Sequence, residues 1–279
     1  MHFYKYQALG NDYIVIPPAH LSAALTAAQI IRICDRHYGV GSDGILLGPL
    51  PSSEADFGLR LFNPDGGEFE KSGNGLRIFA RYLWDAGLAG DAPFMIMTPG
   101  GRVTAQIFDR GRRVQVDMGQ VSFDSTKIPV LGPPRAVLNE TMTVGGETVQ
   151  YCAATVGNPH CVVLMDTVDA ALAQRLGPLI EHEPRFPNRT NVQFMQVLDR
   201  NNIQIEIWER GAAYTLASGS SSSAAAAVAH RLGLCDQEIN VHCPGGVIEI
   251  AIGDDWSIRM TGAVTRVCHG EMADEAFAG

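Results

Sequence analysis

Apolar and polar positions along this chain follow two periods. Alternation with period two comes after a Pro-Gly-Gly turn at residues 102–107 and again at residues 247–252, which predicts a strand in each place. Short β-branched runs follow a Gly-Asn turn at residues 13–16 and 161–164 and predict two more strands.

The helical period predicts two matched helices. Apolar residues at three- and four-residue steps between positions 76 and 83 share one face, and Gly87 stands where a C-terminal cap is expected. An alanine-rich helix over residues 224–231 ends in the same way before Gly233, and a further helix is predicted over residues 26–38. Strands outnumber helices, so the pattern predicts an α+β fold.

The same motifs occur twice. Ser72 and Ser218 stand 146 residues apart, and the same offset separates Gly87 from Gly233. Three more motif pairs follow at offsets of 143 to 147 residues: Leu9-Gly10-Asn11 with Val156-Gly157-Asn158, Pro99-Gly100-Gly101 with Pro244-Gly245-Gly246, and residues 116–119 with residues 259–262. Matches at nearly constant spacing indicate two copies of one module.

The duplication sets the expected domains. We expect one module at residues 1–119 and a second at residues 120–263, with a turn-rich join over residues 119–134. Residues 264–279 lie outside the second copy and are expected to pack back on the first module. Their polar end, from residue 272 onward, is expected to be frayed.

Composition limits the function. The 279 residues are 46% hydrophobic and 18% charged, which suits a folded protein with a real core. A net charge of -9 disfavours nucleic acid and anionic membranes as partners. No apolar run reaches the ~20 residues of a membrane span, and the N-terminus lacks signal-peptide features. We therefore expect a cytoplasmic protein with a small-molecule ligand and no nucleic-acid or membrane partner.

The six cysteines are widely spaced, and no C-x-x-C motif is present. This spacing predicts free, mostly buried thiols, without a disulfide framework and without a metal site.

Each predicted helix of the matched pair begins with a Ser/Gly/Asn segment, at residues 72–75 and 218–220. A helix N-terminus presents unpaired N–H groups and a partial positive charge, and glycine lets a ligand approach closely. If the two modules face each other across one cleft, both helix ends can hold one α-carboxylate. This arrangement suits a two-base inversion at the α-carbon, in which one group removes a proton and the opposite group returns one.

Six motifs, in order along nearly the whole chain, resemble the diaminopimelate epimerase family: Leu9-Gly10-Asn11-Asp12, Phe62-Asn63-Pro64-Asp65-Gly66, Ser72-Gly73-Asn74-Gly75, Gly157-Asn158-Pro159-His160, Arg189-Thr190-Asn191-Val192 and Glu209-Arg210-Gly211. The resemblance implies two pseudo-symmetric domains, each a strand-rich, barrel-like sheet around a central helix, with the active site in the cleft between them. It implies an amino-acid racemase or epimerase of lysine biosynthesis that needs no pyridoxal phosphate or other cofactor. A homodimer is also compatible with it.

The resemblance also assigns roles to residues. The catalytic positions are Ser72 and Ser218, and His160 and Glu209 match positions that tune the catalytic pair. Arg210 would bind a distal carboxylate, and Glu209 would also lie beside the amino acid. The remaining implied substrate contacts are Asn11, Asn63, Gly73, Asn74, Asn158, Asn191, Gly219 and Ser220.

Both catalytic positions depart from the family, where the two bases are cysteines. A thiolate at a helix N-terminus is a competent base, whereas a serine hydroxyl stays protonated near neutral pH unless a neighbouring base activates it. An engineered double Cys-to-Ser variant and a natural divergent branch both explain the serines. Lys71 beside Ser72, and Tyr214 in place of a usual acidic residue, favour the natural branch.

Further departures concern the substrate and the assembly. Ala213 replaces a usual glycine, Gly44 stands where some members place a glutamine against the ligand, and Cys268 replaces a dimer-forming tyrosine.

Three hypotheses follow from these residues. The chain is a racemase or epimerase acting through Ser72 and Ser218, a catalytically silent binder of an amino acid, or an isomerase or lyase that uses Lys71, Glu209 or Tyr214 as its base.

Three other motifs are weaker. Residues 39–44 read G-x-G-x-x-G, but they follow a predicted helix and precede a predicted strand, which is the wrong order for a dinucleotide site. Residues 220–223 resemble a serine linker, but an alanine helix follows them. Ser218 and His160 suggest a hydrolase pair, but no G-x-S-x-G motif is present.

Overall fold

The computed structural model describes residues 1–21 and 23–277. The chain forms two compact units, which divide it at Asp117/Met118 and at Met260/Thr261. The first unit holds residues 1–117 together with the C-terminal residues from Thr261 onward, and the second unit holds Met118–Met260. The first boundary falls inside the strand that ends the first copy of the repeat.

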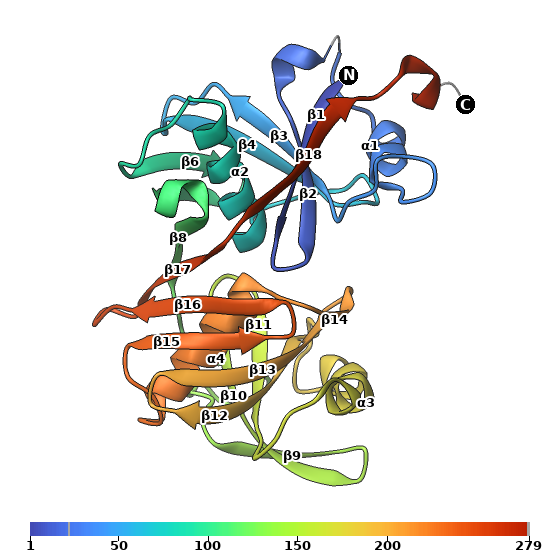
Figure 1. The fold of residues 1–279 in the computed structure, drawn as a ribbon. Coiled ribbons are helices and arrows are strands. Elements are labelled where there is room, and N and C mark those ends of the chain that lie inside the picture. Colours follow the sequence, from blue (N-terminus) through green and yellow to red (C-terminus); the bar gives the residue numbers. More distant parts are fainter. Residues whose placement is uncertain (22, 278–279) are drawn as a thin grey trace. The chain divides into compact units, whose positions relative to one another are not determined.

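Figure 1 labels most of the helices and strands of both units along the chain. The first unit contains β1 (His2–Ala8), β2 (Asn11–Ile16), η1 (Pro18–His20), α1 (Ala27–Cys34), β3 (Ile45–Leu50), β4 (Phe57–Phe62), β5 (Glu68–Phe69), α2 (Gly73–Asp85), β6 (Phe94–Thr98), β7 (Gly101–Phe108), η2 (Asp109–Gly111), β18 (Thr265–Glu271), η3 (Asp274–Phe277) and most of β8 (Arg113–Gln120).

The second unit repeats this order. It contains β9 (Glu140–Val144), β10 (Glu147–Thr155), β11 (Pro159–Leu164), α3 (Ala170–Glu181), β12 (Asn191–Asp199), β13 (Asn202–Glu209), β14 (Ala213–Thr215), α4 (Gly219–Arg231), β15 (Glu238–Cys243), β16 (Gly246–Ile252) and most of β17 (Ser257–Ala263).

Strand pairing is the same in both units. In the first, β1 and β2 are antiparallel, β2 and β3 parallel, β3 and β4 antiparallel, and β4 and β6 parallel. In the second, β10–β11, β11–β12, β12–β13 and β13–β15 follow the same sequence of directions. The predicted α+β class and the internal duplication are therefore confirmed.

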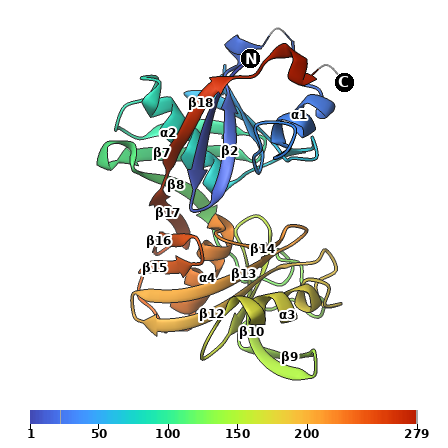
Figure 2. The same ribbon diagram turned by 45° about the vertical axis from the view of Figure 1, so that its right-hand side comes forward.

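Each unit has one helix enclosed by its strands (Figures 1 and 2). Helix α2 contacts β1, β2, β3 and β7, and helix α4 contacts β10, β11, β12, β13, β15 and β16. Apolar side chains of α2 fill the space on the sheet side, whereas α4 places serine and alanine there. Residues 221–229 of α4 are all buried, and their small side chains allow the strands to approach the helix closely.

The two enclosed helices begin and end with matching backbone angles. Ser72 and Ser218, which precede them, have φ/ψ of -138°/123° and -141°/125°. Gly87 and Gly233, which follow them, have φ of 69° and 73°, a left-handed conformation that glycine adopts without a Cβ penalty. The two predicted glycine caps are confirmed.

Two local predictions were wrong. Helix α1 ends at Cys34 and does not continue to Tyr38, because Asp35 adopts an extended ψ of 127° and its carboxylate accepts the N–H groups of His37 and Tyr38. The segment from residue 272 is also not frayed where it is described. Met272 is buried, and the Arg32 Nε–H donates to the carbonyl of Ala276 over 3.0 Å; residues 278–279 lie outside the described residues.

The cysteines are free thiols, as the spacing predicted. Cys34, Cys152, Cys161 and Cys235 are buried, while Cys243 is half-buried and Cys268 is exposed. Within the described ranges, no group of three or more His, Cys, Asp or Glu side chains is placed to hold a metal ion. None of the helices in the described part of the chain is both long enough and apolar enough to cross a membrane.

Candidate active site

The N-termini of α2 and α4 carry the candidate chemistry. Ser72 Oγ accepts the Gly75 N–H over 3.0 Å, and Ser218 Oγ accepts the Ser221 N–H over 3.4 Å. Both serines are therefore helix N-caps, and their hydroxyl groups lie beside the N–H groups of the first turn, which have no acceptor within the helix. Each end can hold a carboxylate.

In the first unit, a chain of amides leads away from the α2 end. The Asn74 Nδ2 group donates to Asn11 Oδ1 over 3.1 Å, and Asn11 Nδ2 donates to Asp43 over 2.8 Å. On the other side, the fully buried Arg77 donates to Asn74 Oδ1 over 2.5 Å. The structure thus brings the two predicted residues Asn11 and Asn74 together and fixes which way each amide points.

Tyr13 is a residue at this end that the sequence analysis missed. Its hydroxyl donates to Ser72 Oγ over 3.5 Å, and its ring lies against Gly44. A Cβ added at Gly44 would lie 2.7 Å from Tyr13 Cε1 and 2.5 Å from the Phe62 carbonyl oxygen. Gly44 therefore makes room for the tyrosine where some family members place a glutamine. The phenol is a polar group that the motif search did not include.

Asn63 lies apart from these contacts. It is exposed in the turn between β4 and β5, where its backbone N–H donates to the Gly67 carbonyl over 2.8 Å. Its side chain points to solvent within this unit.

In the second unit, Asn191 connects two of the predicted motifs. Its Nδ2 donates to the Pro159 carbonyl over 2.9 Å, and its Oδ1 accepts the Arg210 N–H over 3.0 Å. Asn191 is buried, so its amide holds the loop before β11 and the loop after β13 in a fixed relation.

Glu181 holds the second of these loops, and it too was missed. Its buried carboxylate accepts hydrogen bonds from Gly211 N (3.1 Å), Trp208 Nε1 (2.8 Å) and Arg189 Nη1 (3.1 Å). A carboxylate inside a helix that looks amphipathic has no local sequence signal, because its partners lie 8 to 30 residues away.

The Glu209–Arg210 pair is partly exposed at the start of this loop. Glu209 Oε2 accepts the Thr215 hydroxyl over 3.2 Å, and Arg210 Nη1 donates to the Asn188 carbonyl over 2.9 Å. Both charged groups remain accessible enough to meet a ligand.

His160 is fully buried beside Asn158. Its Nε2 lies 2.9 Å from Asn158 Oδ1. Burial lowers the pKa of His160 to about 3, the Gln193 side chain opposes that change, and the charge of Arg210 adds to it. The imidazole is therefore neutral at physiological pH.

Hydrogen bonds account for the serines that follow Ser218. Ser221 Oγ accepts from Gln193 Nε2 over 3.0 Å, Ser222 Oγ lies 3.5 Å from Cys243 Sγ, and Ser223 Oγ donates to the Gly219 carbonyl over 2.8 Å. All three are fully buried within α4, so the alternative of a flexible serine linker is wrong.

Two of the alternative bases, Lys71 and Tyr214, have pKa values that are shifted in opposite directions. Burial lowers the pKa of Lys71, with an opposing effect from the Asp117 charge. Burial, reinforced by the Glu206 carboxylate that accepts its hydroxyl over 2.7 Å, raises the pKa of Tyr214 above its usual range. Tyr214 therefore keeps its proton near neutral pH.

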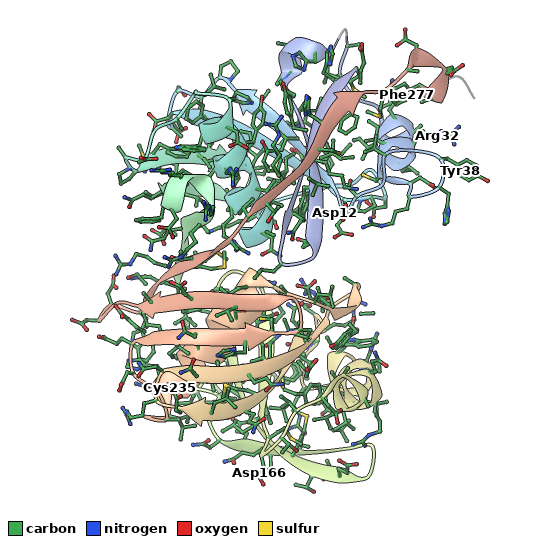
Figure 3. The ribbon with its side chains drawn as sticks, in the orientation of Figure 1. Asp12, Arg32, Tyr38, Asp166, Cys235 and Phe277 are labelled. Atoms are coloured by element: carbon green, nitrogen blue, oxygen red, sulfur yellow. The ribbon has the colours of Figure 1, made fainter. Side chains whose placement is uncertain are left out.

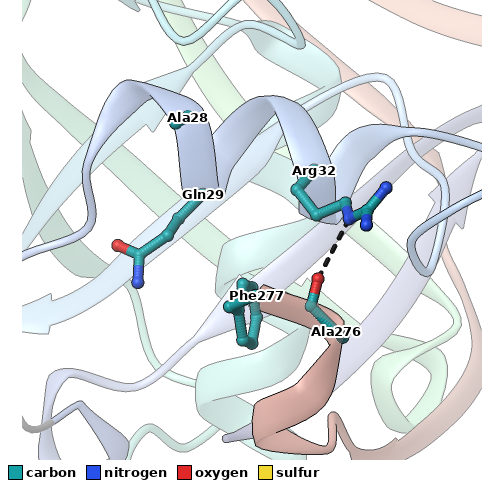
Figure 4. Close-up of a pocket in the computed structure, with 5 residues that line it drawn as sticks. All are labelled: Ala28, Gln29, Arg32, Ala276 and Phe277. Atoms are coloured by element: carbon teal, nitrogen blue, oxygen red, sulfur yellow. Dashed lines mark hydrogen bonds between the residues drawn. The ribbon is translucent and has the colours of Figure 1, made fainter. Parts of the chain in front are cut away.

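A small depression elsewhere in the first unit is a separate feature. It is lined by Ala28, Gln29 and Arg32 of α1 and by Ala276 and Phe277 of η3 (Figures 3 and 4). None of these residues belongs to the predicted motifs.

Comparison with known proteins decides the family. Residues 3–123 and 152–267 match the family model described as diaminopimelate epimerase. The "Diaminopimelate epimerase 2" of Nostoc sp. is 60% identical over 278 residues, covering 100% of this chain and 98% of the relative. This chain belongs to the diaminopimelate epimerase family. The diaminopimelate epimerase of Moorella thermoacetica is 38% identical, with 97% and 99% covered.

Solved structures share the fold of this family at low identity. A probable proline racemase from Agrobacterium radiobacter K84 superposes with a TM-score of 0.70 at 16% identity, covering 99% of this chain and 94% of that one. A phenazine biosynthesis protein of the PhzF family from Bacillus anthracis gives 0.68 at 17% identity, covering 98% and 99%. The family assignment makes this chain an isomerase of the racemase and epimerase type.

Proposed function

We propose that this chain inverts the α-carbon of diaminopimelate, or of a related amino acid with a polar far end, by a two-base reaction without pyridoxal phosphate. The observation that carries the proposal is the matched pair of serine-capped helix N-termini, which the duplication places at equivalent positions of the two units. Relatives across the full length of the chain are named diaminopimelate epimerase, which supports this substrate.

In this proposal both helix ends contact one substrate. The N–H groups of Gly73–Asn74 and Gly219–Ser220 hold the α-carboxylate, and they stabilise the negative charge that develops when the α-proton leaves. Asn11, Asn63 and Asn158 orient the amino-acid head group, Glu209 lies beside its amino group, and Arg210 binds the distal carboxylate. Asn191, whose amide is already used by two backbone groups, contributes by fixing the loops around it.

The serines restrict the mechanism. Groups within hydrogen-bonding distance of Ser72 Oγ are the Tyr13 hydroxyl and the Gly75 N–H, and those near Ser218 Oγ are the Ser220 hydroxyl and the Ser221 N–H. None of these groups is a base at neutral pH. His160 is fully buried, and its pKa of about 3 makes its imidazole a weak base.

This observation favours a second candidate, binding without inversion. The same helix ends would hold the amino acid while its α-proton stays in place. A divergent isomerase or lyase reaction remains the third candidate, with Lys71, Glu209 or Tyr214 as its base. Burial lowers the pKa of Lys71 and increases its neutral fraction, which favours Lys71 among them.

Incubation with diaminopimelate isomers in deuterium oxide separates the three candidates. Exchange of the α-proton with inversion supports the epimerase, binding without exchange supports the silent protein, and exchange or elimination without inversion supports another base. Chiral chromatography and proton NMR give the readouts, and calorimetry measures binding.

A serine-to-cysteine series tests the catalytic positions. We expect Ser72→Cys/Ser218→Cys to exchange the α-proton at least 100-fold faster than the unmodified chain, because thiolates at helix N-termini are far better bases. Ser53→Cys, at an exposed serine outside the motifs, is the control and should leave the rate unchanged. A double variant that binds but exchanges no faster would contradict the proposed roles.

Assembly as a homodimer is part of the proposal. Cys268 is exposed on β18, at the position where the family carries a dimer-forming tyrosine. Sedimentation equilibrium should give twice the 30.0 kDa chain mass, and a mass of one chain would contradict it.

A further inference from the structure

Two polar atoms in the interior of the second unit have no hydrogen-bond partner. They are His160 Nδ1 and Gln193 Oε1, and both residues are fully buried. The two side chains are neighbours: Gln193 on β12 is in register with Val162 of β11, two residues from His160 on the same face of the strand, and the Gln193 amide influences the ionisation of the His160 ring. Unpaired polar atoms in a protein interior are costly, so a neighbouring pair of them indicates an arrangement that satisfies both.

The contacts of the imidazole define that arrangement. His160 Nε2 faces Asn158 Oδ1 at 2.9 Å. A carbonyl-type oxygen accepts, so we infer that the proton of the neutral ring lies on Nε2. The Nδ1 atom then carries a lone pair and needs a donor. Gln193 Oε1 cannot donate, but the amide nitrogen of the same side chain can.

A half-turn of the Gln193 amide satisfies every group at once. After the rotation, Gln193 Nε2 donates to His160 Nδ1, and Gln193 Oε1 accepts the hydroxyl proton of Ser221. Before the rotation, Ser221 Oγ lies 3.0 Å from Gln193 Nε2. Oxygen and nitrogen of an amide exchange places in this rotation without any backbone movement. The result is a continuous chain of hydrogen bonds from Asn158 through His160 and Gln193 to Ser221 in the first turn of α4.

We propose that Gln193 is a positioning residue for the substrate amide of Asn158. By donating to Nδ1, Gln193 keeps His160 as the Nε2–H tautomer, and that proton holds Asn158 Oδ1 turned inward. Asn158 is half-buried, and its Nδ2 group is then directed away from the ring, where it donates to a carboxylate oxygen of the ligand. The same chain of hydrogen bonds ties the Asn158 loop to the helix end capped by Ser218. This inference rests on the proposed function for the identity of the ligand.

The tautomer of His160 tests the proposal directly and needs no catalysis. Long-range proton–nitrogen NMR spectra of the full-length, nitrogen-15-labelled protein distinguish a protonated from an unprotonated Nδ1, and His160→Gln identifies the His160 signals by their loss. We expect Nε2–H in the unmodified chain. A carboxylate can only accept, so Gln193→Glu should move a proton to Nδ1. A ring already protonated at Nδ1, or a ring that keeps Nε2–H in Gln193→Glu, would overturn the proposal.

Binding provides the second readout. Gln193→Met keeps the approximate volume but cannot donate, and we expect KM for diaminopimelate to rise about tenfold with little change in kcat, as for one lost positioning contact. If the chain binds without turnover, the Kd from calorimetry should rise by the same factor. Gln196→Glu, on the same strand but half-exposed, is the control. An unchanged KM and Kd in Gln193→Met would contradict the positioning role.

The two proposals fail separately. A chain without α-proton exchange contradicts the epimerase reaction, whereas the tautomer spectra still decide the role of Gln193. If Gln193→Glu does not fold, the spectrum of the unmodified chain alone decides it.

Discussion

At the scale of single residues, the candidate site depends on side chains that hold other side chains. Asn11, Asn74 and Asn191 come from the sequence motifs, but Asp43, Arg77 and Glu181 determine how they or their loops are oriented. We propose the same role for Gln193 toward Asn158. Because burial already fixes their geometry, these positioning side chains do not need to rearrange when a ligand binds.

Substitution of Gly44 should test the space occupied by Tyr13. Gly44→Ala places a Cβ within 2.7 Å of the Tyr13 ring and 2.5 Å of the Phe62 carbonyl oxygen, so the ring must shift away from Ser72. We expect a loss of about 1–3 kcal/mol in the free energy of unfolding, measured in urea. Gly90→Ala, which meets no atom within 4 Å, should change it by less than ~0.5 kcal/mol. Equal values for both variants would contradict this packing.

The buried imidazole of His160 should make stability depend on pH. Its folded pKa of about 3 lies below the ordinary 6.5, so the unfolded chain binds a proton that the folded chain does not between these values. The stability contribution is complete above pH 6.5 and is lost as pH falls toward 3. Urea unfolding between pH 7 and 4 should therefore show a steeper decline in the unmodified chain than in His160→Gln, and parallel curves would exclude the effect.

At the scale of elements, the two enclosed helices have nearly the same boundaries but different interiors. Helix α2 carries large apolar residues such as Phe79 and Leu83, and α4 carries alanine and serine, yet both are capped by serine and ended by glycine. The caps therefore set the helix ends, and the helix interior varies with the strands packed around it.

The capping glycines should respond alike to the same change. Gly87→Ala and Gly233→Ala each force a Cβ into a left-handed conformation, with φ of 69° and 73° and no other atom within 4 Å. We expect each to lower the free energy of unfolding by about 1 kcal/mol. Thermal unfolding followed by circular dichroism measures both, again with Gly90→Ala for comparison. A difference of more than ~1 kcal/mol between the two would show that the repeats differ at this point.

At the scale of the whole molecule, the duplication supplies two equivalent helix ends, and the proposed reaction uses both. Hydrogen exchange measured by mass spectrometry should reveal this. Saturating diaminopimelate should slow exchange at residues 73–76 and at residues 219–222 together, since both first turns would donate to one ligand. The first turn of α1, which closes its own N-terminus through Thr26 and Gln29, should not change. Protection confined to one helix would contradict a shared ligand.

The sequence by itself determined the two enclosed helices, four of the strands, the duplication and the family. Local signals were sufficient here, because glycine caps, turn motifs and periodicity act within a few residues, and the 146-residue repeat makes each signal appear twice. The end of α1 had a local signal that periodicity does not register, since Asp35 accepts the N–H groups of His37 and Tyr38. Local signals failed in the segment from residue 272, where Arg32 binds a carbonyl 244 residues away.

Only the tertiary structure determined how the site residues are held. Three contacts depend on strand pairing and burial over 27 to 59 residues of sequence: Tyr13 reaches Ser72, Glu181 secures the Gly211 loop, and Gln193 lies between His160 and α4. Burial also shifts the pKa values: desolvation lowers that of His160 and raises that of Tyr214, and residue type alone does not specify either shift.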